Sequence, residues 1–268
     1  MSTRDFRAAV YREHLRALEK AERTRAWSVF SDVDWSLAAT TPKDEELALC
    51  AETFLGVELF LPDYLAHGIT AWRERFGQVL FAASWGAEEA KHSIVLKELL
   101  LRTGQRTEDQ LLDFESALLA RRWEPPFECP RKAVLYGLLQ EQTTFVNYTK
   151  HAAFAQERGA PLLTSIYRLI ARDEVAHARF HEAIAALLLA EDRAGTLADL
   201  AAVLRAFRMP ARDLLPDSER RHRVFVQAGI DGVTFVRDIW LPVLKRLGID
   251  RHELPRSAAG QAQPEGAA

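Results

Sequence analysis

Apolar residues recur at intervals of three and four positions along almost the whole chain, and alternating polar and apolar runs are nearly absent. The first pattern is typical of helices with one buried face, whereas the second would indicate strands. The sequence therefore predicts an all-α protein. We expect helices at about 3–27, 45–61, 70–101, 131–157 and 162–191, a shorter one over LLDFESALLARRW, and two or three more after DRAGT.

The breaks between these helices are rich in residues that favour turns, as in SDVDWSLAATTPKD, EPPFECP and RGAP. Pro62 fits the exit of the second helix. No repeat of fixed period is visible, which argues against a solenoid. We therefore expect one helical domain over residues 1–255. The last stretch, 256–268, is mostly Ala, Gly, Gln and Pro with little to bury, so we expect it to be disordered.

Composition narrows the possible functions. A chain of 268 residues with 48% hydrophobic content can bury a substantial core. Its net charge of -3 argues against a nucleic-acid partner, which would need a basic surface. The two cysteines form no CxxC motif, so no thiolate zinc site is indicated. Without an apolar leader or a long uncharged apolar segment, the sequence predicts a cytoplasmic protein with no transmembrane segment.

Three Glu-x-x-His motifs stand out against this background. On a helix, positions i and i+3 lie on one face, so such a pair can offer a carboxylate oxygen and an imidazole nitrogen to the same metal ion. With 23 Glu and 8 His in the chain, random placement would give fewer than one such pair. The three pairs are Glu89 with His92, Glu174 with His177, and Glu219 with His222.

Context separates the three copies. The Glu219 copy follows a proline turn and lies among arginines, which predicts an exposed helix start capped by Ser218 or Asp217. The other two copies lie well inside long apolar helices, as in AEEAKHSIVLKELL. A charge buried there is costly unless it is paired or binds a metal.

Two lone glutamates complete a possible metal site. Glu58 and Glu141 each interrupt a neutral stretch of a long helix, where a single acid is more often a residue at the edge of the core. Carboxylate-bridged di-metal bundles, however, combine two Glu-x-x-His helices with one Glu from each of two others. Four carboxylates and two imidazoles suit two ferrous or manganous ions and match no common zinc site.

Several segments resemble those of the soluble acyl-[acyl-carrier-protein] desaturases. They keep the family's order between about 45 and 211, and they are GVELFLPDY, SWGAEEAKH, LLQEQTTFVNY, ARDEVAHARF and DRAGTLADLAAVLRAFRMPA. The resemblance implies a ferritin-like four-helix bundle with flanking helices. It also implies a ligand set in which Glu58 and His92 bind one iron, Glu141 and His177 bind the other, and Glu89 and Glu174 bridge the two.

The resemblance extends to residues beside the ligands. It implies that Asp173, and less strongly Glu88, orient the ligating imidazoles. Thr144 matches the family's threonine beside the oxygen-binding face, although its hydroxyl could instead bond back to its own helix. His181, one turn after the second motif, matches no family ligand and is expected not to bind metal. The family's tryptophans near the metals correspond to Trp85 and to either Trp27 or Trp35, for which core packing is the simpler alternative.

The resemblance implies an O2-dependent di-iron enzyme, with two Fe ions and with Mn as the alternative metal. Such an enzyme introduces a cis double bond into a fatty acyl chain on acyl carrier protein, takes electrons from a ferredoxin-type donor and forms a homodimer. Two alternatives remain open: another di-iron oxygenase (hydroxylase or N-oxygenase), or a ferritin-like ferroxidase or iron-binding protein. Basic candidates for the acidic carrier are Arg73, Arg75, Lys91, Lys97 and residues 220–223, although scattered surface charges are the commoner explanation.

Overall fold

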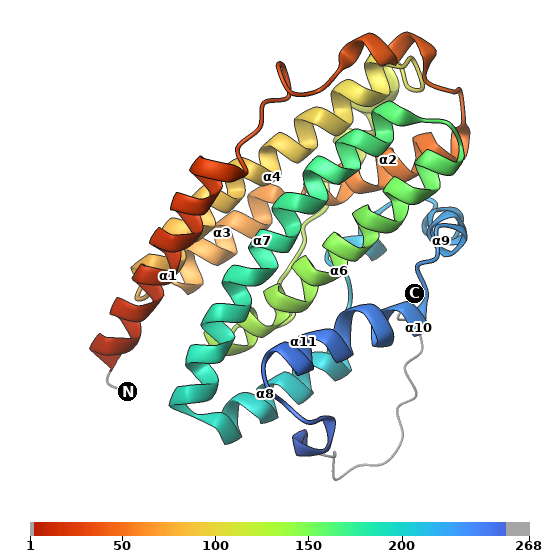
Figure 1. Cartoon of the computed structure of the whole chain (residues 1–268). Helices are drawn as coiled ribbons and strands as arrows, with labels where there is room; N and C mark the ends of the chain where they lie inside the picture. Colours follow the sequence, from red (N-terminus) through yellow and green to blue (C-terminus); the bar gives the residue numbers. More distant parts are fainter. Residues whose placement is uncertain (1–2, 256–268) are drawn as a thin grey trace.

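The computed structural model of the protein describes residues 3–255, and every regular element within them is helical (Figure 1). The α-helices are α1 (Thr3–Thr24), α2 (Glu45–Glu58), α3 (Leu61–Ala71), α4 (Phe76–Arg102), α5 (Glu108–Leu119), α6 (Pro130–Glu157), α7 (Pro161–Glu191), α8 (Arg193–Ala206), α9 (Ser218–Gln227), α10 (Gly232–Thr234) and α11 (Leu241–Arg246). Shorter turns are η1 (Trp35–Thr40), η2 (Arg212–Leu214), the π-helical η3 (Phe235–Trp240) and η4 (Arg251–Glu253). The expected tail at 256–268 lies outside the described residues.

Four helices, α2, α4, α6 and α7, form the central bundle. The two longest, α6 and α7, lie side by side along their length and are joined by a three-residue connection (Figure 1). Gly159 in that connection has φ +68°, a conformation that costs glycine little, and Pro161 then starts α7. The short connection makes the two helices antiparallel neighbours.

The helix starts follow local chemistry. Asp44 caps α2, where its carboxylate accepts hydrogen bonds from the backbone N–H groups of Glu46 and Leu47. Thr107 and Gln110 form a reciprocal capping box at the start of α5. Helix α6 opens with a proline at its first position, where a missing N–H is not needed. These signals set where the helices of the bundle begin.

The largest buried cluster lies in one half of the bundle. Leu96 and Leu99 from α4 pack there with Tyr148 from α6 and with Leu163 and Ile166 from α7, all at most 1% exposed. Truncating one of these leucines to alanine typically costs about 2–5 kcal/mol. This apolar packing holds the helices that carry the candidate metal ligands.

The remaining helices cover the bundle. Helix α1 packs against α4 and α7, α3 against α4, and α8 against α6 and α7. At the other side, α9 packs against α2, and η3 packs against α6 near α8 and α11 (Figure 1). None of the helices in residues 3–255 combines the length and apolarity that a bilayer crossing requires.

Two element predictions were wrong. Pro62 was expected to end a helix, but it lies in the first turn of α3, a helix that the sequence pattern did not predict. Proline is well tolerated at that position because the first N–H groups of a helix have no intrahelical partner. Helix α8 also begins at Arg193, before the expected start after DRAGT, because Asp192 caps it by accepting from the Gly195 N–H.

Candidate metal centre

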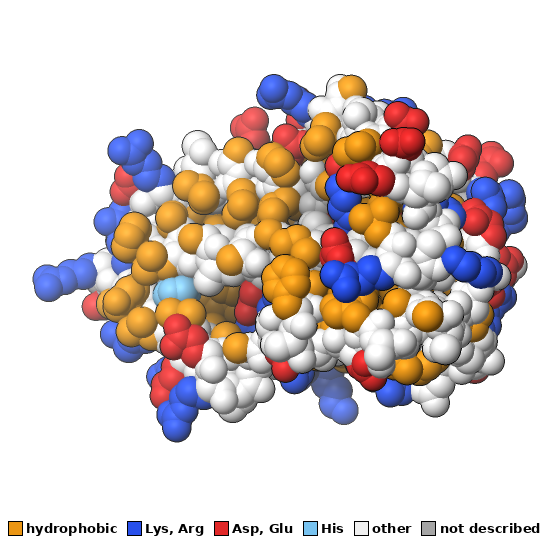
Figure 2. Space-filling view, turned by 90° about the horizontal axis from the view of Figure 1, so that it is seen from above, with side chains coloured by type: hydrophobic (Ala, Val, Ile, Leu, Met, Phe, Trp, Pro, Cys, Tyr) orange, Lys and Arg blue, Asp and Glu red, His pale blue; other side chains and the backbone are white. Residues whose placement is uncertain are grey.

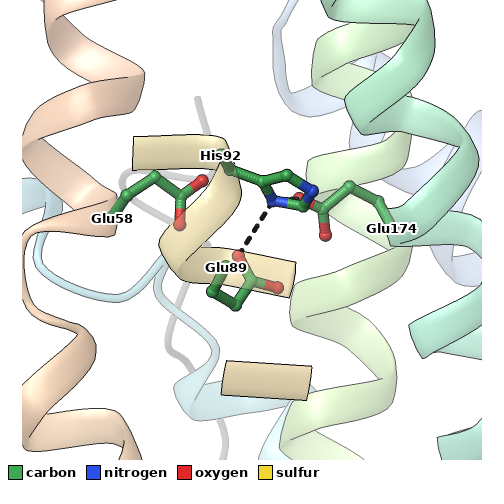
Figure 3. Close-up of side chains that lie close together, drawn as sticks. All are labelled: Glu58, Glu89, His92 and Glu174. Atoms are coloured by element: carbon green, nitrogen blue, oxygen red, sulfur yellow. Dashed lines mark hydrogen bonds and ion pairs between the residues drawn. The ribbon is translucent and has the colours of Figure 1, made fainter. Parts of the chain in front are cut away.

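Each of the four bundle helices brings a buried carboxylate to one place in the core. Their donor atoms form two overlapping groups, each with all atoms within 4.8 Å of one another. One group is Glu58, Glu89, His92 and Glu174, and the other is Glu89, Glu141, Glu174 and His177. Figure 3 shows the first group, with Glu58 and Glu174 facing each other from α2 and α7 across the α4 residues Glu89 and His92.

Glu89 and Glu174 belong to both groups, which is the arrangement expected of carboxylates that bridge two ions. Of their four oxygens, only Oε2 of Glu89 has a hydrogen bond, with His92 Nδ1 at 3.1 Å. Both oxygens of Glu174, Oε1 of Glu89 and Nδ1 of His177 are shielded from solvent and have no hydrogen-bond partner. His177 Nδ1 is 3.2 Å from Glu89 Oε1 and His92 Nδ1 is 3.4 Å from Glu174 Oε1, close but poorly aligned. Unpaired buried donors and acceptors of this kind fit bound cations.

Without an ion, protons have to balance the buried charge. Burial, together with the charges of Glu89 and Glu174, raises the pKa of Glu58. Burial acts in the same direction on Glu89, but the neighbouring His92 and His177 outweigh it and lower the pKa of Glu89. His92 itself is buried, yet Glu89 and Asp173 raise its pKa to about 9. The centre therefore holds positive charge on its histidines until divalent ions replace the protons.

The donor set also agrees with the chemistry of iron. Oxygen and imidazole ligands suit Fe2+ and Mn2+, which are intermediate in hardness, and four carboxylates neutralise two divalent cations. The buried Glu and His groups thus fit a di-iron site, with manganese as a possible occupant.

The outer nitrogen of each histidine meets a second carboxylate. His92 Nε2 lies 3.2 Å from Asp173 Oδ2, and His177 Nε2 lies 2.7 Å from Glu88 Oε2. Arg25 forms ion pairs with both outer carboxylates. Such contacts fix the ring orientation and leave Nδ1 of each histidine to face the ligand groups. The sequence ranked Glu88 below Asp173, but Glu88 makes the shorter contact.

Trp27, rather than Trp35, extends this network. The Trp27 indole N–H donates to Asp173 Oδ2 at 2.7 Å, and its ring stacks parallel to that of His92 with centroids 6.5 Å apart. The Trp35 indole N–H donates to a backbone carbonyl in its own loop. Trp85 lies edge-on to His177 with ring centroids 6.5 Å apart. A sequence pattern cannot rank Trp27 over Trp35, because the choice depends on how the loop after α1 folds back.

Two polar residues of α6 lie near the centre. Thr144 donates its hydroxyl to the Gln140 carbonyl at 2.9 Å, the back-bonded arrangement weighed as its alternative. Tyr148, which the sequence did not single out, is fully buried and donates its hydroxyl to Glu58 Oε1 at 3.1 Å. Glu141, Thr144 and Tyr148 follow the i, i+3, i+7 spacing of one helix face, a signal that could have identified Tyr148.

The third Glu-x-x-His motif and His181, which were expected not to bind metal, lie outside both groups of candidate ligands. Glu219 is exposed at the start of α9, and His222 accepts a hydrogen bond from Arg212 at 3.0 Å. Asp217 occupies the cap position of α9 but makes no side-chain cap hydrogen bond. His181 is buried outside both groups of candidate ligands, and its pKa is lowered to about 3 by burial and by the charge of His177.

Two apolar pockets approach the centre from different sides. The first, called the Glu58 pocket, reaches Glu58 and Thr144 between α2, α6 and the chain after α8. The second, called the Glu141 pocket, reaches Glu141 and His181 between α3, α4, α6 and α7. Figure 2 shows hydrophobic side chains gathered on the face seen from above, with a hollow among them.

Three of the basic residues considered for a carrier protein pair with acids of this chain. Lys91 lies 3.5 Å from Asp173 and over the Trp27 ring, and Lys97 pairs with Glu115 at 2.6 Å. Arg221 is buried and pairs with a glutamate of α2. These positive charges are therefore neutralised by acidic side chains of the same chain.

Solved structures of other proteins share the fold of this chain. The candidate acyl-ACP desaturase DesA2 of Mycobacterium tuberculosis H37Rv superposes with a TM-score of 0.66 at 19% identity, covering 91% of this chain and 95% of that chain. An R2-like ligand-binding oxidase with a Mn/Fe cofactor superposes with a TM-score of 0.55 at 17% identity, covering 92% and 94%. Similarity at these identities establishes the ferritin-like fold. No curated protein matches the chain in sequence.

The family follows from the sequence match. Residues 68–253, more than two thirds of the chain, match the fatty acid desaturase family. This segment includes both buried Glu-x-x-His motifs and Glu141, while Glu58 lies just before it. The chain belongs to the fatty acid desaturase family.

Proposed function

We propose that the protein is an O2-dependent di-iron desaturase that forms a cis double bond in a fatty acyl chain held on acyl carrier protein. The observation that carries the proposal is the position of the two apolar pockets, one beside Glu58 and the other beside Glu141. A long apolar chain that occupied both would pass the candidate ligands with its middle carbons. Buried, mostly apolar surroundings also exclude water from the reacting carbons.

The residues proposed to hold the two irons are those of the two overlapping groups. Glu58 and His92 would bind one iron, Glu141 and His177 the other, and Glu89 and Glu174 would bridge them. When bound, the iron pair supplies the activation of O2. The reaction removes one hydrogen from each of two adjacent methylenes and reduces O2 to two water molecules, with two electrons from the donor and two protons from solvent.

Other side chains would position these groups. Asp173 and Glu88 hold the two imidazoles through Nε2, which keeps their Nδ1 atoms directed at the ligand groups. The Tyr148 hydroxyl holds one oxygen of Glu58 and leaves the other free to bind an ion. Thr144 lines the Glu58 pocket, so its methyl and hydroxyl groups would adjoin the acyl chain.

The proposed partners are acyl carrier protein and a ferredoxin-type electron donor, and the proposed assembly is a cytoplasmic homodimer. The resemblance to acyl-carrier desaturases supports both partners. Arg208 and Arg212 also line the Glu58 pocket, and such cationic groups suit the phosphate and acidic surface of a loaded carrier protein.

Product analysis tests the reaction. The iron-loaded protein would be incubated with stearoyl or palmitoyl carrier protein, ferredoxin, its reductase and O2, and the acyl products separated by mass spectrometry. We expect a mono-unsaturated chain and consumption of two electrons per double bond. Hydroxylated chains alone would contradict desaturation and favour another oxygenase, whereas fast iron oxidation without acyl substrate would favour a ferroxidase.

Metal analysis tests the ligand set with an internal control. The chain offers matched Glu-x-x-His motifs, so Glu174→Gln can be compared with Glu219→Gln. We expect two irons per chain in the unaltered protein and in Glu219→Gln, and marked loss of iron in Glu174→Gln. Equal iron content in the two variants would remove Glu174 from the ligand set.

A second candidate is a ligand-binding oxidase with a mixed manganese and iron centre. The structural similarity to R2-like ligand-binding oxidases and a donor set suited to both metals favour it. Loading the metal-free protein with equimolar Mn2+ and Fe2+ under anaerobic conditions distinguishes the two. One manganese and one iron per chain would favour this candidate, and two irons would favour the desaturase.

A further inference from the structure

The two candidate metal positions have different surroundings. They share the two bridging glutamates, so each is distinguished by one further glutamate and one histidine. We call the position with Glu58 and His92 the Glu58 metal position, and the position with Glu141 and His177 the Glu141 metal position. Because the bridging groups contribute to both, a difference in affinity between the positions depends on these four residues and on the groups that contact them.

Glu58 has one oxygen engaged by a hydroxyl. The buried Tyr148 hydroxyl donates to Glu58 Oε1 at 3.1 Å, and Figure 3 shows Glu58 extending from α2 toward the other ligands. A hydrogen bond to a carboxylate lowers its basicity, and a less basic oxygen binds a cation less strongly. Among residues 3–255, the one polar partner of Glu141 is His177, whose Nδ1 lies 3.3 Å from Glu141 Oε2. Glu141 is therefore the stronger donor of the two carboxylates.

The carboxylate behind His92 is shared among several donors. Asp173 Oδ2 lies 3.2 Å from His92 Nε2. The same oxygen accepts a hydrogen bond from the Trp27 indole N–H at 2.7 Å and lies 3.5 Å from the Lys91 ammonium. Arg25 pairs with the other oxygen, Oδ1, at 2.5 Å. Trp27 and Lys91 therefore compete with the imidazole for the oxygen that holds it.

The carboxylate behind His177 has fewer partners. Among residues 3–255, Glu88 pairs with His177 and Arg25, and Arg25 does not distinguish the two outer carboxylates because it also pairs with Asp173. Glu88 Oε2 lies 2.7 Å from His177 Nε2, against 3.2 Å for Asp173 and His92, although the Glu88 side chain is 22% exposed and that of Asp173 is fully buried. The shorter contact is the stronger one, and it raises the basicity of the imidazole more.

Both differences act in the same direction. At the Glu58 metal position the carboxylate and the imidazole are each weakened as donors, whereas at the Glu141 metal position neither is. We propose that the Glu141 metal position binds a divalent ion first, and that Tyr148, Trp27 and Lys91 make the Glu58 metal position the weaker one. The proposal deepens the proposed function and rests on its ligand set, but not on the identity of the acyl substrate.

Calorimetric titration of the full-length, metal-free protein with Mn2+ under anaerobic conditions tests the proposal. Repulsion between two ions by itself weakens the second binding step, so the decisive result is which step each variant changes. We expect Glu88→Gln to weaken the first step about tenfold or more, and Asp173→Asn to weaken the second step by a similar factor while leaving the first unchanged. The reverse assignment, or equal effects of the two variants on both steps, would overturn the proposal.

Two further variants are expected to bind metal more tightly, which damage to the fold would not produce. Lys91→Met removes the ammonium but keeps a side chain of similar length, and Tyr148→Phe removes only the hydroxyl. Each frees a carboxylate oxygen at the Glu58 metal position, so we expect the second step to tighten about tenfold, the effect of about one hydrogen bond.

Lys97→Met is the control for the loss of a positive charge. Lys97 lies on the same helix as Lys91 but pairs with Glu115 instead of an outer carboxylate. We expect this variant to leave both steps unchanged, and thermal unfolding would verify that all the variants are folded. Equal tightening of both steps in Lys91→Met, or no tightening of the second step in either Lys91→Met or Tyr148→Phe, would overturn the proposal.

The outcomes separate this proposal from the proposed function. The expected assignment of the two steps in a protein that desaturates no carrier-bound chain would contradict the proposed function while supporting the order of binding. Desaturation by a protein in which Asp173→Asn weakens the first step would support the proposed function and overturn the order of binding.

Discussion

At the scale of single residues, the candidate metal centre is supported by two carboxylates outside both groups of candidate ligands. Asp173 and Glu88 occupy equivalent positions, each against the Nε2 atom of one histidine. Arg25 forms ion pairs with both carboxylates, and its positive charge offsets the free-energy cost of burying their negative charge. The two histidines are consequently fixed from outside before any ion binds.

Replacing the buried outer carboxylate should therefore weaken metal binding. In Asp173→Asn the side chain keeps its shape but loses the charge that holds the His92 imidazole and Arg25, and we expect iron affinity to fall by about 10–100-fold. Competition with a chelator measures this affinity. Asp109→Asn, at an exposed position of α5, is the control, and an affinity in Asp173→Asn equal to that of the control would contradict the role given to Asp173.

The charge on the histidines gives the metal-free protein a characteristic pH dependence. The pKa of His92 in the fold is about 9, above its ordinary value of 6.5. Protonation of His92 thus stabilises the metal-free fold below about pH 6.5, and this contribution, on the order of 3 kcal/mol, is lost as the pH rises through 9.

We expect thermal unfolding of the metal-free protein to shift to lower temperature between pH 6.5 and 9. The metal-loaded protein should show a much smaller shift, since its histidines are bound to metal instead of protons. Metal-free protein that is equally stable at both pH values would show that His92 is not protonated in the absence of metal.

At the scale of helices, the sequence predicted the bundle well because its signal is periodic. The long helices α6 and α7 carry regular apolar spacing and begin at prolines, and their expected ranges lie close to those observed. Helix α4 was expected from about residue 70 but begins at Phe76, where no side chain caps it. The four carboxylate positions could be identified for the same reason, since an acid inside an apolar run stands out. Helix α3 was missed because Pro62 can either end a helix or lie in its first turn.

The rest of the site could not be predicted because it depends on contacts between distant segments. Arg25 and Trp27 reach Asp173 only because the chain after α1 folds back across α7. Hydrophobic periodicity in the sequence does not predict the path of the chain after α1. Likewise, the two pockets arise from gaps between helices, which depend on packing angles and side-chain sizes together.

The contact between α1 and α4 provides a test at this scale. A Cβ at Gly77 would lie 2.7 Å from the Tyr11 backbone nitrogen and 2.8 Å from its Cα, and the backbone cannot move aside as a side chain can. Gly77→Ala should therefore lower the free energy of unfolding by about 1–3 kcal/mol, measured by urea denaturation.

Gly68→Ala is the matched control. At Gly68, the nearest atom to an added Cβ is a Trp72 ring carbon at 3.4 Å, and alanine is the better helix former. We expect this variant to be neutral or stabilised by up to about 1 kcal/mol. If both substitutions had the same effect, close approach of α1 to Gly77 would not explain why glycine is needed there.

At the scale of the whole molecule, the metal centre lies between two pockets that open among different helices. The Glu58 pocket is bounded by the chain after α8, which includes Met209, whereas the Glu141 pocket is bounded by α3 and the segment before α6. The segments outside the four-helix bundle therefore shape what can reach the metals, and the bundle itself supplies the ligands.

A bulkier side chain on the wall of the Glu58 pocket should reduce access of the substrate to the centre without changing metal binding by the bundle helices. Met209→Trp adds bulk to the pocket wall, and we expect it to reduce kcat/KM for a long acyl chain at least tenfold while leaving two irons per chain. Met209→Leu, which nearly conserves volume, should behave as the unaltered protein. Loss of iron in Met209→Trp would show that the pocket wall and the ligand set are not independent.

The contacts of Arg25 and Trp27 also constrain the order in which the protein can assemble. Their shared partner, Asp173, lies 148 and 146 positions later in the chain. During synthesis Arg25 and Trp27 are made well before Asp173 and cannot make these contacts until the chain has been extended into α7. The support of the His92 imidazole by this network is therefore completed late, after the other three bundle helices have been made.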